Sequence, residues 1–166
     1  ISACLVGSEM CIRDRFATGP RWLLEAMEKL QGQQTSGACS ISQHAAIAAL
    51  DGPKDFIAHS REVFQRRRDF MVELLNQAPG ISCEVPGGAF YAFADCSGLI
   101  GKRSPAGCEL VNDEAVALAL LEEANVAVVQ GSAFGLSGYL RIAYALDDDS
   151  LRAACQAIHR FCEDAR

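Results

Sequence analysis

The chain has 166 residues, enough for one domain or for one domain and part of another. Half of the residues are apolar and the net charge is −6, which is typical of a soluble globular protein and argues against general nucleic-acid binding. No apolar run reaches the ~20 residues that a membrane span needs, and no signal peptide is visible. The eight cysteines are scattered without a C-x-x-C pair, which favours free thiols in a cytoplasmic protein over a disulfide framework.

The first residues differ in character from the rest of the chain. The string LVGSEMCIRD, residues 5–14, has neither helical nor strand periodicity. It resembles one reading frame of a transposase adapter that is used to prepare DNA for sequencing. We therefore expect residues 1–15 to be an artefact, genuine sequence to begin near Phe16, and the chain to be a fragment.

The next part of the sequence predicts two helices. Pro20 is well placed at the first position of a helix whose apolar residues recur at helical spacing from Trp22 to Leu30. The small and polar segment 32–40 suits a loop. Ser40 or Ser42 could cap a second helix, which the Asp-Gly-Pro sequence at residues 51–53 ends.

The remainder alternates between predicted helices and strands. A long amphipathic helix is expected over residues 54–77 and a short one over 113–124, with Val116, Leu120 and Leu121 pointing inward. Gly- and Pro-containing turns separate the expected strands, and residues 99–111 read as an exposed loop. The strands are expected at 81–85, 89–94, 126–129 and 139–145, and a closing helix at 147–165. This order indicates an α/β or α+β layer arrangement.

One basic residue stands out within an apolar strand. In YLRIAYA, residues 139–145, Leu140, Ile142 and Tyr144 share one face, whereas Arg141 and Ala143 occupy the other. A guanidinium among apolar residues is costly unless a negative group meets it. Its planar fork matches a carboxylate, so an acid substrate could be the partner. A structural ion pair or a position on an exposed edge is the alternative.

The context of this strand points to a family. The run VVQGSAFGLSGYLRIAYA, residues 128–145, strongly resembles the C-terminal signature of class I aminotransferases that use pyridoxal phosphate (PLP). In that signature a Pro-Gly-Ser-Ala-Phe-Gly loop precedes a strand whose arginine binds the substrate α-carboxylate. The resemblance covers the chain after residue 15. The QRRRD run, the GGAFYAF strand and the loop with Gly101-Lys102 most resemble the bacterial branch with aspartate and prephenate aminotransferases.

The resemblance implies a fold and a division of the chain. The fold would be the C-terminal part of the fold-type I PLP-dependent transferase fold, an α/β protein with an α+β small domain. Residues 16–52 would end the large PLP-binding domain, and residues 53–166 would form the interdomain helix and the small domain. The intact parent would be a cytoplasmic homodimer.

The same resemblance implies positions for the site residues. Arg141 would bind the substrate α-carboxylate, and Phe90 would lie near the substrate cleft. Gln130 stands where the family usually has proline. Residues 33–36, Gln-Gln-Thr-Ser, resemble a segment that approaches the active site of the partner subunit, or they form a polar connector.

The catalytic lysine of the family is missing from this sequence. That lysine lies in a Ser-Lys segment shortly before Gly-Pro, where it forms a Schiff base with PLP. The lysines here are Lys29, Lys54 and Lys102, and none has that context. The aspartate that pairs with the pyridine nitrogen is also missing. The sequence thus predicts no catalytic and no cofactor-binding residue in this chain, which would be inactive alone.

The predicted activity of the intact parent is the transfer of an amino group between an amino acid, aspartate or glutamate, and a 2-oxo acid. An effector-sensing aminotransferase-like domain of a transcription regulator is one alternative, and a stand-alone module without catalysis is another. Cys155, His159 and Cys162 share a helical face and could bind zinc, but core packing is the favoured interpretation. Likewise, the arginines at 66–68 could contact phosphate, but a solvated face with salt bridges is favoured.

Overall fold

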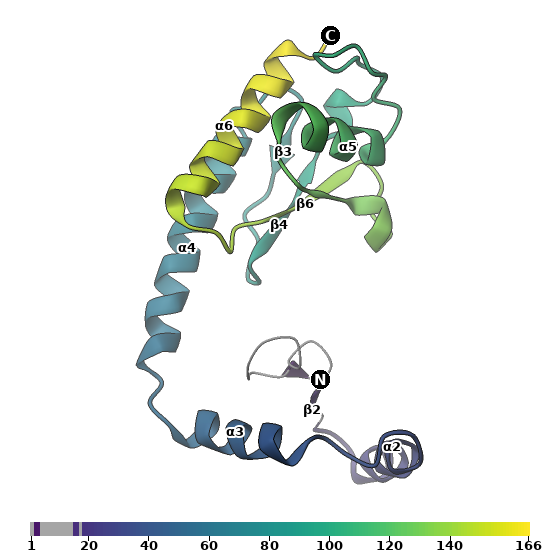
Figure 1. The fold of residues 1–166 in the computed structure, drawn as a ribbon, viewed down its shortest axis with the longest axis vertical. Coiled ribbons are helices and arrows are strands. Elements are labelled where there is room, and N and C mark those ends of the chain that lie inside the picture. The colour runs from purple at the N-terminus through teal and green to yellow at the C-terminus, as the bar shows by residue number, and fades with distance from the viewer. Residues whose placement is uncertain (1, 4–14, 17) are drawn as a thin grey trace. The chain divides into compact units, whose positions relative to one another are not determined.

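The computed structural model describes residues 2–3, 15–16 and 18–166 (Figure 1). These residues form two compact units, one that ends at Phe56 and one from Ile57 to Arg166. The string LVGSEMCIRD lies outside the described residues, so the adapter interpretation stays a prediction. The division into large and small domains at residue 52 also stays a prediction. In the described part of the chain, no helix combines the length and apolar character that crossing a membrane requires.

The first unit contains a strand pair and two helices. Strands β1 (Ser2–Ala3) and β2 (Arg15–Phe16) pair antiparallel, and helices α2 (Arg21–Gln34) and α3 (Ser40–Asp51) follow. The predicted loop from residue 32 is wrong in its first part, because α2 continues to Gln34. The N–H of Thr35 closes this last turn by donating to the carbonyl of Gln31 at 2.8 Å. A glycine inside a helix costs only about 1 kcal/mol, so Gly32 does not end α2.

Helix α3 begins at Ser40, but its predicted serine cap is wrong. Cys39 occupies the N-cap position, and no side chain caps the helix there. Neither α2 nor α3 has a buried residue, and the side chains of Trp22, Leu30 and Ile41 are 71%, 66% and 77% exposed. The described helices of the first unit therefore present apolar surface that they do not bury among themselves.

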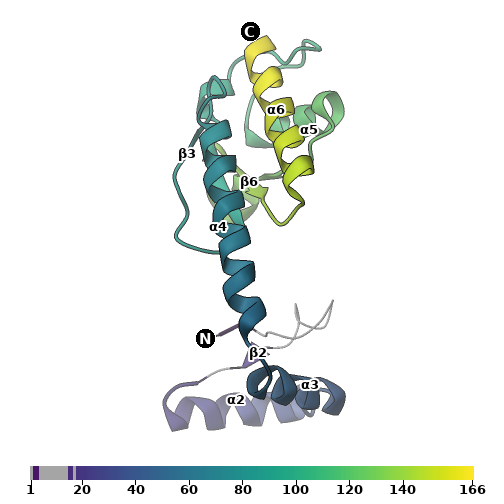
Figure 2. The same cartoon turned by 90° about the vertical axis from the view of Figure 1, so that its left-hand side faces the viewer.

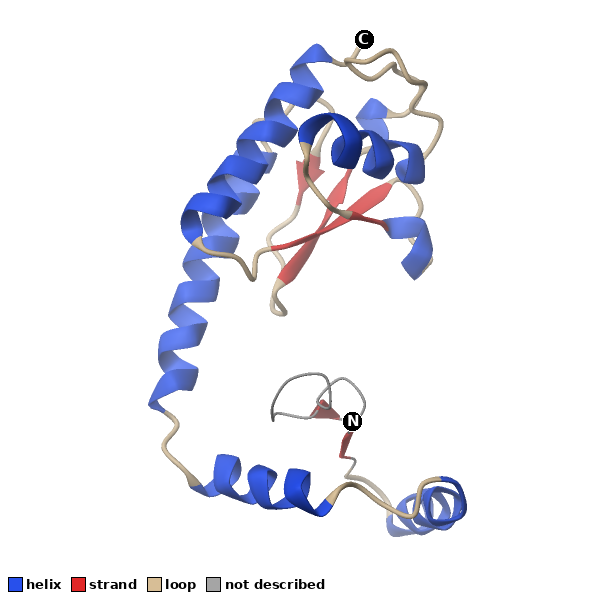
Figure 3. Ribbon diagram, in the orientation of Figure 1, coloured by secondary structure: helices blue, strands red, loops and turns tan. Residues whose placement is uncertain are grey.

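The second unit is built on a four-stranded antiparallel sheet (Figure 3). The strand order is β3-β4-β6-β5, with β3 at Ser82–Cys83, β4 at Tyr91–Asp95, β6 at Tyr139–Ala143 and β5 at Val129–Gln130. The predicted strand positions are confirmed for β3, β4 and β6, with shorter paired segments. The strand predicted at 126–129 is shifted, because β5 shares only Val129 with that range. Strand β4 starts at Tyr91 instead of residue 89, because Ala89 has a left-handed backbone with φ of +67°.

Three helices pack with the sheet in one core (Figure 2). They are α4 (Asp55–Leu75), α5 (Asp113–Ala124) and α6 (Asp148–Asp164), close to the predicted ranges. Leu140 and Ile142 of β6 face this core. The helices contribute the buried side chains Met71, Val72 and Leu75 from α4, Val116 and Leu120 from α5, and Leu151, Cys155, Ile158, Phe161 and Cys162 from α6. The mixed helix and sheet unit agrees with the predicted fold class.

Two burial predictions are wrong in this unit. Leu121 was expected to point inward, but 48% of it is exposed, because the core contacts α5 along Val116 and Leu120. The segment 99–111 was expected to be an exposed loop, yet Leu99 and Leu110 are fully buried. The N–H of Leu110 donates to the carbonyl of Lys102 at 2.9 Å, so the segment folds back on itself and inserts both leucines.

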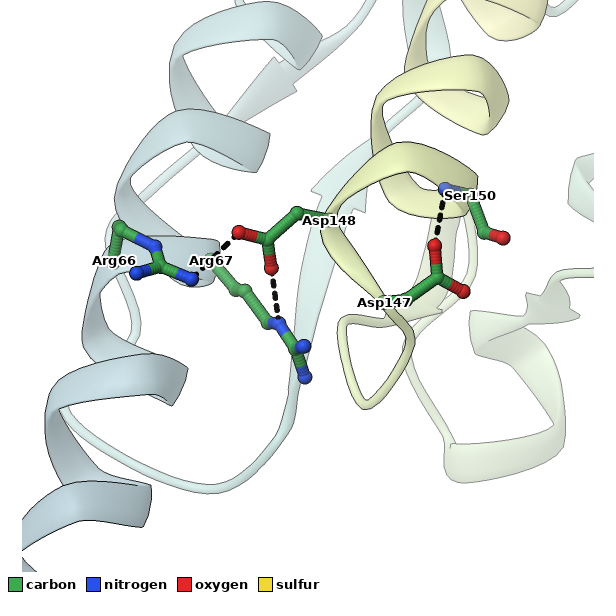
Figure 4. Close-up of polar contacts among 5 residues, drawn as sticks. All are labelled: Arg66, Arg67, Asp147, Asp148 and Ser150. Atoms are coloured by element: carbon green, nitrogen blue, oxygen red, sulfur yellow. Dashed lines mark hydrogen bonds and ion pairs between the residues drawn. The ribbon is translucent and has the colours of Figure 1, made fainter.

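An ion-pair cluster joins α4 to the start of α6 (Figure 4). Arg66 Nη2 lies 2.6 Å from Asp148 Oδ2, and Arg67 Nε lies 2.7 Å from Asp148 Oδ1. Arg68 pairs with Asp69 and also donates to the carbonyl of Pro86 at 3.2 Å. The salt-bridge interpretation of this arginine run is confirmed, although Arg67 and Arg68 are more buried than a solvated face implies.

The residues considered as zinc ligands lie on α6. Cys155 and Cys162 are buried in the core, as the packing interpretation predicts. His159 is partly exposed, and its Nδ1 lies 3.4 Å from Glu163 Oε2. Burial raises the pKa of the Cys155 thiol to about 11 and that of the Cys162 thiol to about 12. Both side chains therefore behave as small apolar core residues.

Stability is expected to fall at acidic pH through Asp147 and Asp148. Hydrogen bonds from Ser150 lower the pKa of Asp147, and those from Arg67 lower the pKa of Asp148, below the usual 3.8. The stabilisation is complete above pH 3.8 and is lost as the pH falls through the lowered pKa of each group. Urea unfolding followed by circular dichroism between pH 2 and 6 should show a smaller pH dependence for Asp148→Asn than for the unchanged chain. An identical pH profile would contradict this role, and Asp149→Asn is the matched control.

Candidate functional site

The face of the sheet away from the core carries mainly polar and aromatic side chains. Tyr91 and Phe93 of β4 alternate with the buried Ala92 and Ala94. On β6, Arg141 alternates with buried residues in the same way, as the sequence predicted. Arg141 lies directly opposite Phe93 on one side and opposite Val129 of β5 on the other. The site is thus centred on an inner strand of the sheet.

Two aromatic rings hold the guanidinium of Arg141. Its Cζ atom lies 4.3 Å from the ring centroid of Phe134 and 5.3 Å from that of Tyr91. Phe93 contacts the rings of both Phe134 and Tyr91 edge to face, at 5.9 and 6.0 Å between centroids. Each contact of a cation with a ring contributes about 0.5–1 kcal/mol where solvent remains close. Among the described residues, the cluster therefore holds the guanidinium through ring contacts and not through an ion pair.

Both structural alternatives for Arg141 are contradicted among the described residues. No carboxylate of that part of the chain lies within 4.0 Å of the guanidinium, so Arg141 forms no structural ion pair there. It does not lie on an edge, because β6 pairs with β4 on one side and with β5 on the other. Rings that lie over a guanidinium leave its in-plane N–H groups available, and these match a carboxylate with two parallel hydrogen bonds.

Phe134 reaches Arg141 from a tight turn. The turn is the 3-10 helix η2 (Gly131–Phe134), and the N–H of Leu136 closes it by donating to the carbonyl of Gly131 at 3.0 Å. A Cβ atom added at Gly131 would lie 2.8 Å from Tyr139 Cβ and would also collide with the carbonyl oxygen of Leu136. Only glycine fits there. Gln130 has φ of −60°, close to the angle that proline imposes, so the backbone keeps that conformation.

A buried carboxylate that sequence reasoning missed holds this turn. Asp113, the first residue of α5, is 3% exposed and accepts a hydrogen bond from the N–H of Ser132 at 2.7 Å. Burial alone would raise the pKa of Asp113, but hydrogen bonds from Ser132 and Gly138 lower it below its usual value. Asp113 is therefore ionised at neutral pH and fixes η2 against α5. No sequence signal distinguished it from an ordinary acidic residue in a first helical turn.

Phe90, the second predicted site residue, is adjacent to the aromatic cluster. Its ring is 53% exposed and contacts Tyr91 edge to face at 5.4 Å between centroids. Phe90 therefore contacts the aromatic cluster at Tyr91. The hydroxyl of Tyr144 donates to the carbonyl of Ala89 at 3.0 Å and holds the left-handed residue before Phe90. A cavity of about 640 Å³ lies beside this turn, with Tyr91, Phe93 and Tyr139 in its wall.

The three lysines of the chain belong to other elements than those that carry Arg141 and its ring contacts. Lys29 and Lys54 belong to the first unit, where Lys54 Nζ donates to the carbonyl of Leu50 at 2.5 Å. Lys102 lies in the 99–111 segment, and its charge acts on the thiol of Cys162, a core residue. Arg141 therefore offers N–H donors that match an acid group, whereas no lysine of the chain has the sequence context of the family's Schiff-base lysine.

Comparisons with known proteins agree with this geometry. The sequence model of the family described as "Aminotransferase class I and II" matches residues 10–158. The chain is 54% identical over 147 residues to the aspartate/prephenate aminotransferase of Cereibacter sphaeroides, which covers 89% of this chain and 37% of that protein. It is 49% identical to an aspartate aminotransferase of Rhizobium meliloti, with 89% and 36% covered. The chain thus spans little more than a third of the length of these relatives.

Solved structures of aminotransferases match the fold. The crystal structure of the aspartate aminotransferase from Rhizobium meliloti has a TM-score of 0.83 and 47% identity, covering 89% of this chain and 37% of that one. The Thermus thermophilus aspartate aminotransferase with maleate has a TM-score of 0.74 and 32% identity, covering 86% and 35%. The fold is therefore the C-terminal part of a fold-type I aminotransferase, and the chain belongs to the class I and II aminotransferase family.

Proposed function

We propose that this chain is the C-terminal part of a PLP-dependent aminotransferase that moves an amino group between aspartate or glutamate and a 2-oxo acid. The observation that carries the proposal is that the Arg141 guanidinium contacts the rings of Tyr91 and Phe134 and has no carboxylate partner among the described residues. The names of the relatives support an aspartate or prephenate aminotransferase. A structural neighbour with maleate supports a dicarboxylic ligand.

Arg141 is proposed to bind the α-carboxylate of the substrate. Two parallel hydrogen bonds fix both the position and the orientation of a carboxylate, and orientation of the Cα–H bond is a large part of rate acceleration in such reactions. PLP, when bound, supplies the electron sink for the bond changes at Cα. Phe90, which borders the aromatic cluster and is half exposed, is proposed to line the cleft beside the substrate.

The rest of the site is proposed to come from a part of the protein that this chain does not contain. The exposed apolar faces of α2 and α3 support this, since a complete domain would bury them. Residues 16–52 would then end the large domain, residues 53–166 would form the interdomain helix and the small domain, and residues 33–36 would lie near a partner subunit. A cytoplasmic homodimer with PLP is proposed for the intact protein, and this chain alone is proposed to be inactive.

Sequencing the source gene across the junction before Phe16 tests the proposal first. We expect a continuous upstream frame with a Ser-Lys segment before Gly-Pro, in place of the adapter-like string. An upstream winged helix would instead indicate an effector-sensing regulator. A native start codon immediately before LVGSEMCIRD would contradict the adapter interpretation and favour a stand-alone module.

An activity assay then compares the complete protein with this chain. The complete protein should transaminate aspartate with 2-oxoglutarate and show the visible absorbance of bound PLP. The purified 166-residue chain should show neither property, because it lacks the lysine that attaches the cofactor. A folded complete protein without transamination would contradict the proposed function, and an active chain would contradict the proposed division of the site.

A further inference from the structure

Asp113 is a buried carboxylate whose role helix capping does not explain. The N-cap of α5 is Asn112, whose side chain accepts the N–H of Ala115 at 2.8 Å. The carboxylate of Asp113 accepts a hydrogen bond from outside its own helix, from the N–H of Ser132 at 2.7 Å. It is one of only two buried polar or charged residues, with Ser104, in the described part of the chain. Removing a carboxylate from water costs free energy, which its hydrogen bonds have to offset. A buried carboxylate with satisfied hydrogen bonds therefore fixes the segments that it joins.

The structure that Asp113 defines is the turn that carries Phe134. Ser132 is the second residue of η2 and Phe134 is its last. The turn cannot shift easily toward β6, because Gly131 already lies in contact with Tyr139 and Leu136. Asp113 holds the turn from the side of α5. The ring of Phe134 then lies 4.3 Å from Arg141 Cζ. Two contacts, joined by the backbone of η2, therefore link the Asp113 carboxylate to the guanidinium.

We propose that Asp113 is a positioning residue for Arg141, which it aligns with the substrate carboxylate through Ser132, η2 and the ring of Phe134. This inference rests on the proposed function, because it assigns Arg141 to substrate binding. The face of the guanidinium that Phe134 covers sets the plane in which the N–H donors lie. Loss of the Asp113 contact would remove the hydrogen bond that holds η2 from the side of α5 and would let that plane rotate.

A double-mutant cycle on ligand binding tests the proposal. Maleate is the probe, and isothermal titration calorimetry of the complete protein measures its Kd without any turnover. Asp113→Ala should weaken maleate binding about tenfold when Arg141 is present, which is the size of coupling that contacting residues show. In an Arg141→Lys background, where the planar fork is absent, Asp113→Ala should change the Kd less than twofold.

Two further variants keep the test decisive. Asp113→Asn retains a carbonyl oxygen that can accept the Ser132 N–H, so its loss should be smaller than that of Asp113→Ala, and it serves if the alanine variant does not fold. Asp147→Ala removes the cap of α6, whose carboxylate accepts from the Ser150 N–H at 2.9 Å. This matched control should lower the melting temperature and leave the maleate Kd unchanged.

The outcomes separate the inference from the proposed function. A complete protein that binds no maleate, or an Arg141→Lys variant that binds it as tightly as the unchanged protein, overturns the proposed function. Maleate binding that depends on Arg141, but that Asp113→Ala and Asp113→Asn weaken equally in both backgrounds, overturns only the positioning role of Asp113.

Discussion

Replacement of Arg141 by alanine in the complete protein should lower kcat/KM for aspartate by about 100- to 1,000-fold, as expected when one partner of a hydrogen-bonded charge pair is removed. The guanidinium contacts the rings of Tyr91 and Phe134 and pairs with no described carboxylate, so its N–H donors remain for a ligand. Arg141→Lys should recover part of the loss, because an ammonium keeps the charge but not the planar fork. Steady-state kinetics with aspartate and 2-oxoglutarate measure both variants.

A second arginine provides the control for this prediction. Arg103 pairs with Glu109 and donates to the carbonyl of Gly107 at 3.2 Å, within the 99–111 segment. Arg103→Ala removes the same positive charge from an exposed ion pair, and exposed pairs contribute little to stability. It should change kcat/KM less than twofold. Equal kinetics for the Arg141→Ala and unchanged proteins would remove Arg141 from the substrate site.

The central position of the site could be predicted because it depends on local alternation. Side chains along a strand alternate between the two faces of the sheet. The sequence of β6 alone therefore predicts that Arg141 lies on the other face from Leu140 and Ile142. The structure confirms this alternation. The ends of α3 and α4 were also predicted closely, because proline cannot continue a helix and glycine adopts backbone angles that end one.

The partners of Arg141 could not be predicted from those local signals. Tyr91 reaches the guanidinium from β4, and this contact depends on the register in which β4 pairs with β6. Asp113 and Ser132 are 19 residues apart in the sequence, and their hydrogen bond depends on how α5 packs against η2. The same reason explains Leu121 and Leu110, whose burial is set by the tertiary core and not by the pattern around them.

Gly131→Ala should have the largest effect on the stability of the second unit. The added Cβ atom would lie 2.8 Å from Tyr139 Cβ and 2.9 Å from the Tyr139 carbonyl oxygen, and it would also collide with the carbonyl of Leu136. Two of these three atoms belong to the backbone, so a side-chain rotation cannot relieve the contact. Overpacking of this kind costs about 3 kcal/mol or more where the backbone has to move. Urea unfolding of the chain, followed by circular dichroism, measures the loss.

Gly101→Ala is the control that distinguishes the cost of a steric collision from the cost of a left-handed backbone. Gly101 has φ of +89° and no atom within 4 Å of an added Cβ, so alanine there meets only the cost of a left-handed backbone, about 1–2 kcal/mol. Gly131 has no such angle, so its larger expected loss comes from the collision alone. If Gly131→Ala cost less than Gly101→Ala, η2 would be able to move away from Tyr139 without resistance. Phe134 would then not be held over Arg141 by this turn, and the rigid connection from Asp113 to the guanidinium would fail with it.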